Sequence, residues 1–221
     1  MAFPRPVKAV VFDMDGLLVD TEVVYREAMR ATALAEGREF TDEFFLTLVG
    51  HSWPVNAAML TDLYGAGFDP EAFKDEAMRR FHDLLEAEVA LKAGVLEILD
   101  LLDELALPRA IATSSGRPAV DHHIGGHGLL DRFHAIKAAG DYERAKPAPD
   151  PYLRAAEALG VEPRFCLALE DSHNGVRAAA AAGMMTVMVP DLLDPTEEMH
   201  SLCIRIARDL HEVADWVRLT R

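Results

Sequence analysis

The feature that most constrains the fold is a regular alternation of short apolar runs with helical patterns. Five runs predict buried strands: Val7–Phe12, Arg109–Thr113, Ala135–Ala139, Cys166–Leu169 and Thr186–Val189. Amphipathic stretches of helical period lie between them, including Val95–Leu105, Asp150–Leu159 and Val176–Ala182. This alternation is typical of a parallel sheet with helices on both faces. We therefore predict an α/β fold built on a doubly wound parallel sheet of about five strands.

One long segment breaks the alternation. From Thr21 to about Val89 the patterns are helical, and turn residues divide them into about four helices. Apolar residues at three- and four-residue spacing predict one buried helix stripe, made of Phe73, Ala77, Phe81, Leu84, Leu85 and Val89. We interpret residues 21–90 as an inserted all-helical cap domain, and residues 1–20 with 91–221 as the core. Hinges are expected where the chain crosses between them, near residues 17–20 and 89–94.

Charge and hydropathy limit the possible partners. The 221 residues carry a net charge of −15, which argues against nucleic-acid binding because that binding depends on basic surface. The apolar runs are shorter than the roughly 18 residues of a spanning helix, so no membrane partner is expected. The residues before the first predicted strand contain no apolar run of their own, so no cleavable leader is expected. Cys166 and Cys203 are predicted to be reduced thiols of a cytoplasmic protein.

Residues that can bind a cation or a phosphate follow the predicted strands. In chain order they are Asp13, Asp15 and Gly16, then Thr113 and Ser114, then Lys146, then Glu170 and Asp171. Carboxyl ends of parallel strands meet at one edge of a sheet, so these side chains are expected to lie together. Carboxylate oxygens suit a hard cation, and backbone amides at a helix start suit phosphate oxygens. Lys146 is one of only five lysines, and Pro147 and Pro149 restrict the loop that carries it.

The order of these motifs resembles that of the haloacid dehalogenase-like hydrolase superfamily. The helical insertion and the run Lys146-Pro147-Ala148-Pro149-Asp150 resemble its β-phosphoglucomutase and phosphoglycolate phosphatase branch. The resemblance extends from Val7 to about Val189. It implies a Rossmann-like catalytic core with a helical cap that selects the substrate.

The resemblance also implies a role for each motif. Asp13 would be the nucleophile that forms an aspartyl phosphate, and Asp15 the general acid and base. Mg²⁺ would be held by the Asp13 carboxylate, the Asp15 backbone carbonyl and Asp171, with Glu170 bound directly or through water. The phosphoryl oxygens would be held by Thr113, the Ser114 amide and Lys146.

The predicted activity is the hydrolysis of a small phosphorylated metabolite, similar to a sugar phosphate. Asp15 argues against dehalogenation, because a leaving halide needs no proton. A phosphomutase of the β-phosphoglucomutase type is the alternative, although Tyr25 and Trp53 stand where such mutases carry histidine and arginine. Arg79 or Arg80 could replace that cationic grip. A third possibility is a non-catalytic protein that binds a phosphometabolite.

Several further residues have more than one possible role. His51 and Trp53 are candidate substrate contacts, but Trp53 is equally suited to packing within the cap. Thr21 and Glu22 either contact substrate or simply begin a helix after Asp20. Three histidines, His122, His123 and His127, are interpreted as surface or helix-end residues rather than as a zinc site.

Overall fold

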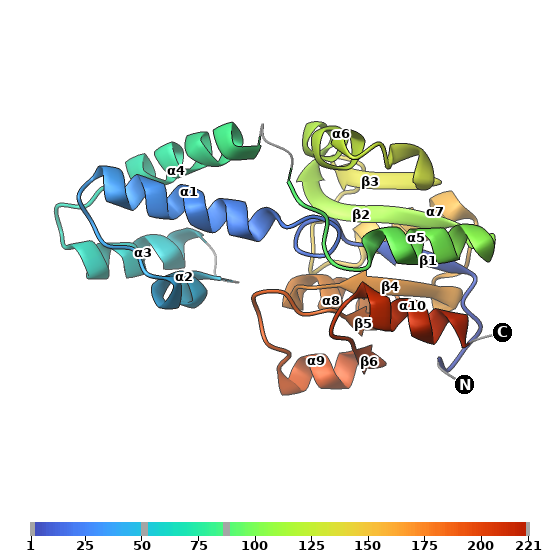
Figure 1. Ribbon diagram of the computed structural model, residues 1–221. Coiled ribbons are helices and arrows are strands. Elements are labelled where there is room, and N and C mark those ends of the chain that lie inside the picture. Colours follow the sequence, from blue (N-terminus) through green and yellow to red (C-terminus); the bar gives the residue numbers. More distant parts are fainter. Residues whose placement is uncertain (1–2, 50–52, 86–88, 220–221) are drawn as a thin grey trace. The chain divides into compact units, whose positions relative to one another are not determined.

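The computed structural model describes residues 3–49, 53–85 and 89–219 (Figure 1). The chain forms two compact units. The core unit comprises residues 1–19 with 90–221, and the helical unit comprises residues 20–89.

The core unit is built on one parallel sheet of six strands (Figure 1). These are β1 (Ala9–Phe12), β2 (Arg109–Gly116), β3 (Ala135–Ala139), β4 (Cys166–Glu170), β5 (Met185–Met188) and β6 (Arg205–Ile206). Their order is β3-β2-β1-β4-β5-β6, so the chain winds outward from β1 to one edge and then from β4 to the other. The strand order therefore reverses between β1 and β4, where ligands of such sheets bind. The prediction of a doubly wound parallel sheet is confirmed.

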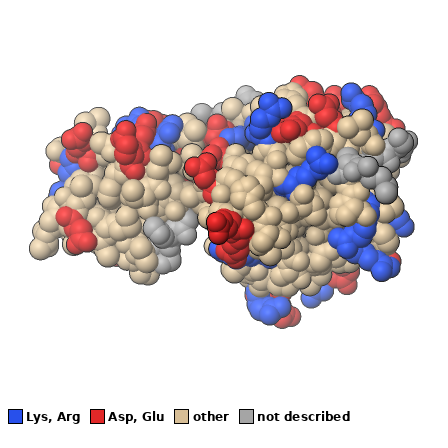
Figure 2. Space-filling model, turned by 90° about the horizontal axis from the view of Figure 1, so that it is seen from below, with Lys and Arg blue, Asp and Glu red and all other residues tan. Residues whose placement is uncertain are grey.

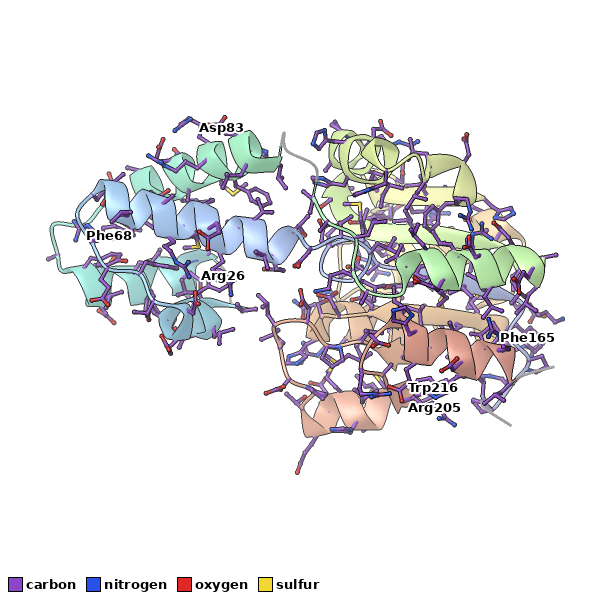
Figure 3. All side chains as sticks on the ribbon, in the orientation of Figure 1. Arg26, Phe68, Asp83, Phe165, Arg205 and Trp216 are labelled. Atoms are coloured by element: carbon purple, nitrogen blue, oxygen red, sulfur yellow. The ribbon has the colours of Figure 1, made fainter. Side chains whose placement is uncertain are left out.

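The strand bounds differ from the prediction at several ends. The first strand begins at Ala9 rather than Val7, and β2 continues to Gly116 rather than ending at Thr113. The sixth strand was missed because two residues are too few for a periodic pattern. Its Arg205 lies over the ring of Trp216, with the guanidinium carbon 4.7 Å from the ring centroid (Figure 3).

Helices cover both faces of the sheet. Those of the core unit are α5 (Val95–Glu104), α6 (Arg117–Gly126), α7 (Asp150–Leu159), α8 (His173–Ala181), α9 (Glu197–Leu202) and α10 (Leu210–Arg218), with short 3₁₀ turns at Leu130–Arg132 and Pro163–Phe165. Helices α7 and α8 pack on one face, while α5 and α10 pack together on the other (Figure 1). Both faces of the sheet are thus buried, which explains the continuously apolar strands.

Small residues bring α7 and α8 close to the sheet. Ala155, Ala156, Ala178 and Ala179 are buried against alternate residues of the strands. Tyr152 is the largest member of this cluster and has no exposed surface. Alanine also favours the helix itself, so propensity and packing agree here.

The helical unit contains α1 (Thr21–Ala35), α2 (Asp42–Leu48), α3 (Trp53–Tyr64) and α4 (Pro70–Leu85). The prediction of an all-helical insertion is confirmed. Helix α4 buries Phe73, Ala77 and Leu85, but Leu84, which was predicted to be part of the buried stripe, is 43% exposed. Leu84 directly precedes Leu85, and adjacent helical residues point about 100° apart, so here the face that buries Leu85 leaves Leu84 directed away from it. Among the described residues, no helix has both the length and the apolar character needed to cross a membrane.

The two chain segments that border the helical unit are hydrogen-bonded to each other inside the core unit. Val19 and Leu91 form an antiparallel bridge, and the Lys92 amide donates to the Leu18 carbonyl at 3.0 Å. Hinges at these segments remain a prediction.

Candidate active site

Asp13 lies at the carboxyl end of the central strand. Its backbone amide donates to the Leu169 carbonyl at 3.0 Å, so the ladder between β1 and β4 carries the side chain to the switch point. Asp13 is buried, with 6% of its surface exposed. Gly16 then turns the chain with φ of 79°. A Cβ at Gly16 would lie 2.3 Å from Asp171 Oδ2, so only glycine leaves room for that carboxylate.

Lys146 bridges two of the acidic motifs. Its Nζ atom donates to Asp13 Oδ1 at 2.6 Å and to Glu170 Oε1 at 2.5 Å. The loop that carries it is closed by Arg144, which donates to the Asp150 carboxylate through its amide and its guanidinium. The peptide bond between Lys146 and Pro147 is cis. The loop thus places one ammonium group between two buried carboxylates.

Glu170 is fully buried at the end of β4 and accepts hydrogen bonds on both oxygens. Tyr152 donates to Oε1 at 2.5 Å, the same oxygen that Lys146 contacts. Ser172 donates to Oε2 from its hydroxyl at 3.1 Å and its amide at 3.3 Å. A Cβ at Gly175 would lie 1.8 Å from Oε1, so this glycine leaves space for the carboxylate. Each contact fixes Glu170 in one orientation.

Asp15 is held by the end of β2. Ser115 Oγ donates to Asp15 Oδ2 at 2.7 Å, and Thr113 Oγ1 lies 3.3 Å from the same oxygen. The Ser115 amide donates to Thr113 Oγ1 at 3.0 Å, and Tyr142 donates to the Thr113 carbonyl at 2.9 Å. The Asp15 side chain is therefore tied to the hydroxyls of β2.

Three carboxylates offer a cation site. Asp13, Glu170 and Asp171 each present an oxygen within 4.8 Å of the others. Asp171 Oδ1 is buried, and nothing in the described part of the chain donates a hydrogen bond to it. A buried acceptor of this kind is costly without a partner, and a divalent cation would satisfy it. The donor set fits a hard cation such as Mg²⁺.

Burial and like charges shift the pKa values of this group. Burial, opposed by Lys146 and reinforced by Glu170 and Asp15, raises the pKa of Asp13 to about 7. Burial and the Asp13 and Glu170 charges raise the pKa of Asp171 well above its usual value. Burial would lower the pKa of Lys146, but the Asp13 and Glu170 carboxylates raise it above its ordinary range. The site therefore contains one group, Lys146, that stays positively charged. This single charge does not balance the buried carboxylates around it.

The chain as a whole is acidic. On the face drawn in Figure 2, Lys and Arg side chains form several separate small groups rather than one continuous basic patch. With a net charge of −15, attraction for an anion must come from local groups such as Lys146.

The predicted substrate contacts fall in the helical unit. A cavity of about 270 Å³ there is lined by Glu22, Tyr25, Met29, Phe45, Leu48, Val49, Trp53, Asn56 and Lys74. Trp53 lines this cavity and is also held by its neighbours, because its Nε1 donates to Glu71 Oε1 at 2.6 Å and Lys74 Nζ lies 5.1 Å from its ring centroid. Thr21 is buried in the first turn of α1, and His51 lies outside the described residues.

The structure agrees with the interpretation of the three histidines as surface or helix-end residues, and it adds that one of them is buried. His122 is exposed and His127 follows the end of α6, but His123 is buried with 4% of its surface exposed. It lies on the face of α6 that also buries Val120 and Ile124, three residues before it and one after. Among the described residues, the potential metal ligands that come together in a group of three or more are Asp13, Glu170 and Asp171, and no histidine belongs to it.

Several partners in the site were missed by sequence reasoning: Ser115, Tyr142, Tyr152 and Ser172. Ser115 and Ser172 adjoin predicted motifs, so adjacency was an available signal. Tyr152 belongs to a predicted helix, and nothing in its spacing distinguishes a hydroxyl that reaches the site from an ordinary core tyrosine.

Comparison with known proteins agrees with this geometry. Residues 7–183 match the family model described as haloacid dehalogenase-like hydrolase. The chain is similar to protein CbbY of Rhodobacter capsulatus, with 34% identity over 83% of this chain and 86% of that protein. It is also similar to the fructose-1-phosphate phosphatase YqaB of Escherichia coli, with 32% identity over 81% of this chain and 95% of the other.

A similar solved structure is a family hydrolase from Deinococcus radiodurans with bound phosphate and sodium. It has a TM-score of 0.83 and 26% identity, and the similarity covers 97% of this chain and 96% of that one. The similarity therefore includes both units of the chain.

Proposed function

Because the chain belongs to the haloacid dehalogenase-like hydrolase family, we propose that it is a magnesium-dependent phosphatase that hydrolyses a small sugar phosphate through an aspartyl phosphate on Asp13. The observation that supports this proposal most directly is that Asp13, Lys146, Glu170 and Asp171 lie together where the strand order of the sheet reverses. The prediction of a phosphoric monoester hydrolase agrees with the phosphatase activities named for relatives.

Asp13 is suited to act as the nucleophile. A carboxylate oxygen would form a bond to phosphorus while the bond from phosphorus to the substrate oxygen breaks. Lys146 lies 2.6 Å from this carboxylate and supplies the nearest fixed positive charge for phosphoryl oxygens. Thr113 and the Ser114 amide would hold the same oxygens from the end of β2.

Asp15 is suited to move the proton. It would give a proton to the departing substrate oxygen, and it would later take one from the water that cleaves the aspartyl phosphate. The hydrogen bonds from Ser115 and Thr113 draw its side chain toward β2. Asp15 would therefore join the metal site through its backbone carbonyl only.

The proposed magnesium ion would be held by Asp13, Asp171 and the Asp15 carbonyl. When bound, it would neutralise charge on the transferring phosphoryl group. Glu170 already accepts four hydrogen bonds, which favours contact through water over direct ligation.

We assign substrate choice to the helical unit, acting as a cap. Its cavity combines aromatic faces with polar groups, as a sugar site requires. Arg79 and Arg80 both form ion pairs with Glu76, and Lys74, the cation that lines the cavity, lies over the ring of Trp53. These contacts favour a phosphatase over a mutase, which needs a cationic grip on a second phosphate. A cytoplasmic location stays a prediction, based on two free cysteines.

The decisive measurement is phosphate release with Mg²⁺ from a panel of sugar phosphates. Asp13→Asn should lower kcat by at least about 10³-fold, because removal of a nucleophile abolishes the covalent route. Asp131→Asn, the same substitution at an exposed position of the core unit, should leave turnover unchanged. Equal rates in wild type and Asp13→Asn would refute the mechanism. An isomerised sugar phosphate as the main product would establish the mutase instead.

A further inference from the structure

Tyr152 is a buried tyrosine with two contacts to the site. It lies in the first turn of α7, three residues before Ala155, and its side chain has no exposed surface. Its hydroxyl donates to Glu170 Oε1 at 2.5 Å. Its ring faces the Lys146 ammonium, with Nζ 5.1 Å from the ring centroid. One side chain therefore contacts both members of the pair that Lys146 and Glu170 form.

The opposite side of Glu170 is equally restrained. Ser172 donates to Oε2 twice, and the absence of a side chain at Gly175 admits the carboxylate to this position. With Ser172 on one oxygen and Tyr152 on the other, the direction of Oε1 is determined. Lys146 Nζ approaches that oxygen at 2.5 Å and reaches Asp13 from there.

The Lys146 side chain is long and needs such support. A lysine has four rotatable bonds, so its ammonium is placed only as well as its partners hold it. Here these partners are Asp13, Glu170 and the face of Tyr152. Asp13 is itself the proposed reacting group, which leaves Glu170 and Tyr152 as the supports that stay in place during the reaction.

We propose that Tyr152 is a positioning residue, which holds Glu170 and Lys146 so that the Lys146 ammonium is fixed beside Asp13. This inference rests on the proposed function. Tyr152 acts through Lys146 and touches no reacting atom. Its ring also offers the quadrupole that favours an adjacent ammonium.

Tyr152 remains a neutral donor in this environment. Burial and the Glu170 and Asp13 charges raise its pKa well above the usual value. The hydroxyl therefore keeps its proton and stays a donor to the carboxylate.

The test uses Tyr152→Phe, which removes only the hydroxyl. Beryllium fluoride with Mg²⁺ imitates the phosphoryl group on an aspartate, and ¹⁹F NMR measures the concentration that half-fills the site. We expect Tyr152→Phe to bind about tenfold more weakly, in the range found for outer partners of such sites. Tyr64→Phe is the matched control, because its hydroxyl also donates to one acceptor, the Glu39 carbonyl, but in the helical unit.

A double-mutant cycle separates positioning from general loss of structure. In a Lys146→Met background, Tyr152→Phe should weaken beryllium fluoride binding by less than twofold, because the group it positions is gone. The proposal is wrong if Tyr152→Phe weakens beryllium fluoride binding by the same factor with and without Lys146→Met. It is also wrong if Tyr152→Phe alone changes the binding by less than twofold. Wild-type protein that binds no beryllium fluoride would instead contradict the proposed function, so the two failures are distinguishable.

Discussion

The buried ionisable side chains of the core unit differ in whether a neighbouring group offsets their charge. Lys146 and Glu170 offset each other's charge at 2.5 Å. His123 has no such partner: its Nδ1 atom is buried, and no described residue hydrogen-bonds to it. Burial lowers the pKa of His123, Asp15 opposes this shift, and His122 and His127 reinforce it. The folded protein therefore holds His123 as the neutral imidazole.

This shift predicts a dependence of stability on pH. Because the folded pKa lies below that of the unfolded chain, the unfolded state binds the proton more readily as the solution becomes acidic. The stabilisation that comes from keeping His123 neutral is fully present above about pH 6.5. It is lost as the pH falls toward the pKa that His123 has in the folded state. Chemical denaturation at pH 7.5 and 5.5 should show a smaller loss of stability in His123→Gln than in wild type.

An exposed histidine away from α6 provides the control for this comparison. His200→Gln should lose as much stability as wild type between the two pH values, since His200 is exposed and is not among the groups that shift the pKa of His123. If His123→Gln follows the wild-type curve in parallel, the buried imidazole does not contribute to acid sensitivity.

At the scale of elements, the helical unit offers a test of substrate choice. Asn56 of α3 lines the cavity, and its Oδ1 atom is buried without a donor among the residues described. If this cavity receives the sugar, a hydroxyl should donate to Oδ1. Asn56→Leu should then lower kcat/KM for sugar phosphates by about tenfold, which corresponds to one hydrogen bond of about 1.4 kcal/mol.

A substrate without hydroxyls isolates this effect. Hydrolysis of p-nitrophenyl phosphate should be the same in Asn56→Leu and wild type. Val55→Ala changes the exposed neighbouring residue and should affect neither substrate. A parallel loss on both substrates would assign Asn56 to the stability of the helical unit rather than to recognition.

Elements also show what a sequence can predict. Strand ends were located because apolar runs stop abruptly at Asp13 and Glu170, and parallel topology then requires these residues to share an edge. The contacts of Tyr152 and Ser115 could not be predicted, because they depend on side-chain direction from α7 and from an extended β2. The burial of His123 was missed for a similar reason, since adjacent histidines give no sign of which one faces the core.

At the scale of the whole molecule, negative charge is in excess both in the composition of the chain and in the site. The chain has 37 acidic and 22 basic residues, and its core unit buries several carboxylates around one ammonium group. The raised pKa of Asp171 means that its ionised form is destabilising near neutral pH without a cation. Function and stability are therefore coupled through the proposed metal site.

Removal of that charge should change the response to magnesium. Without metal, Asp171→Asn should melt at the same temperature as wild type or higher, because a repulsive charge is lost. With Mg²⁺ at 100 times its Kd, wild type should gain about 2.7 kcal/mol, while Asp171→Asn should gain much less. Differential scanning calorimetry of both proteins, with and without Mg²⁺, measures the two effects.

The order of the two melting temperatures should thus reverse when magnesium is added. Asp131→Asn, which alters an exposed carboxylate, should rise with Mg²⁺ as wild type does. A metal-free Asp171→Asn that melts well below wild type would mean that the carboxylate stabilises the fold directly. An equal rise in wild type and Asp171→Asn would place magnesium binding elsewhere. Reversal would show that one carboxylate opposes folding and recruits the cation that compensates for it.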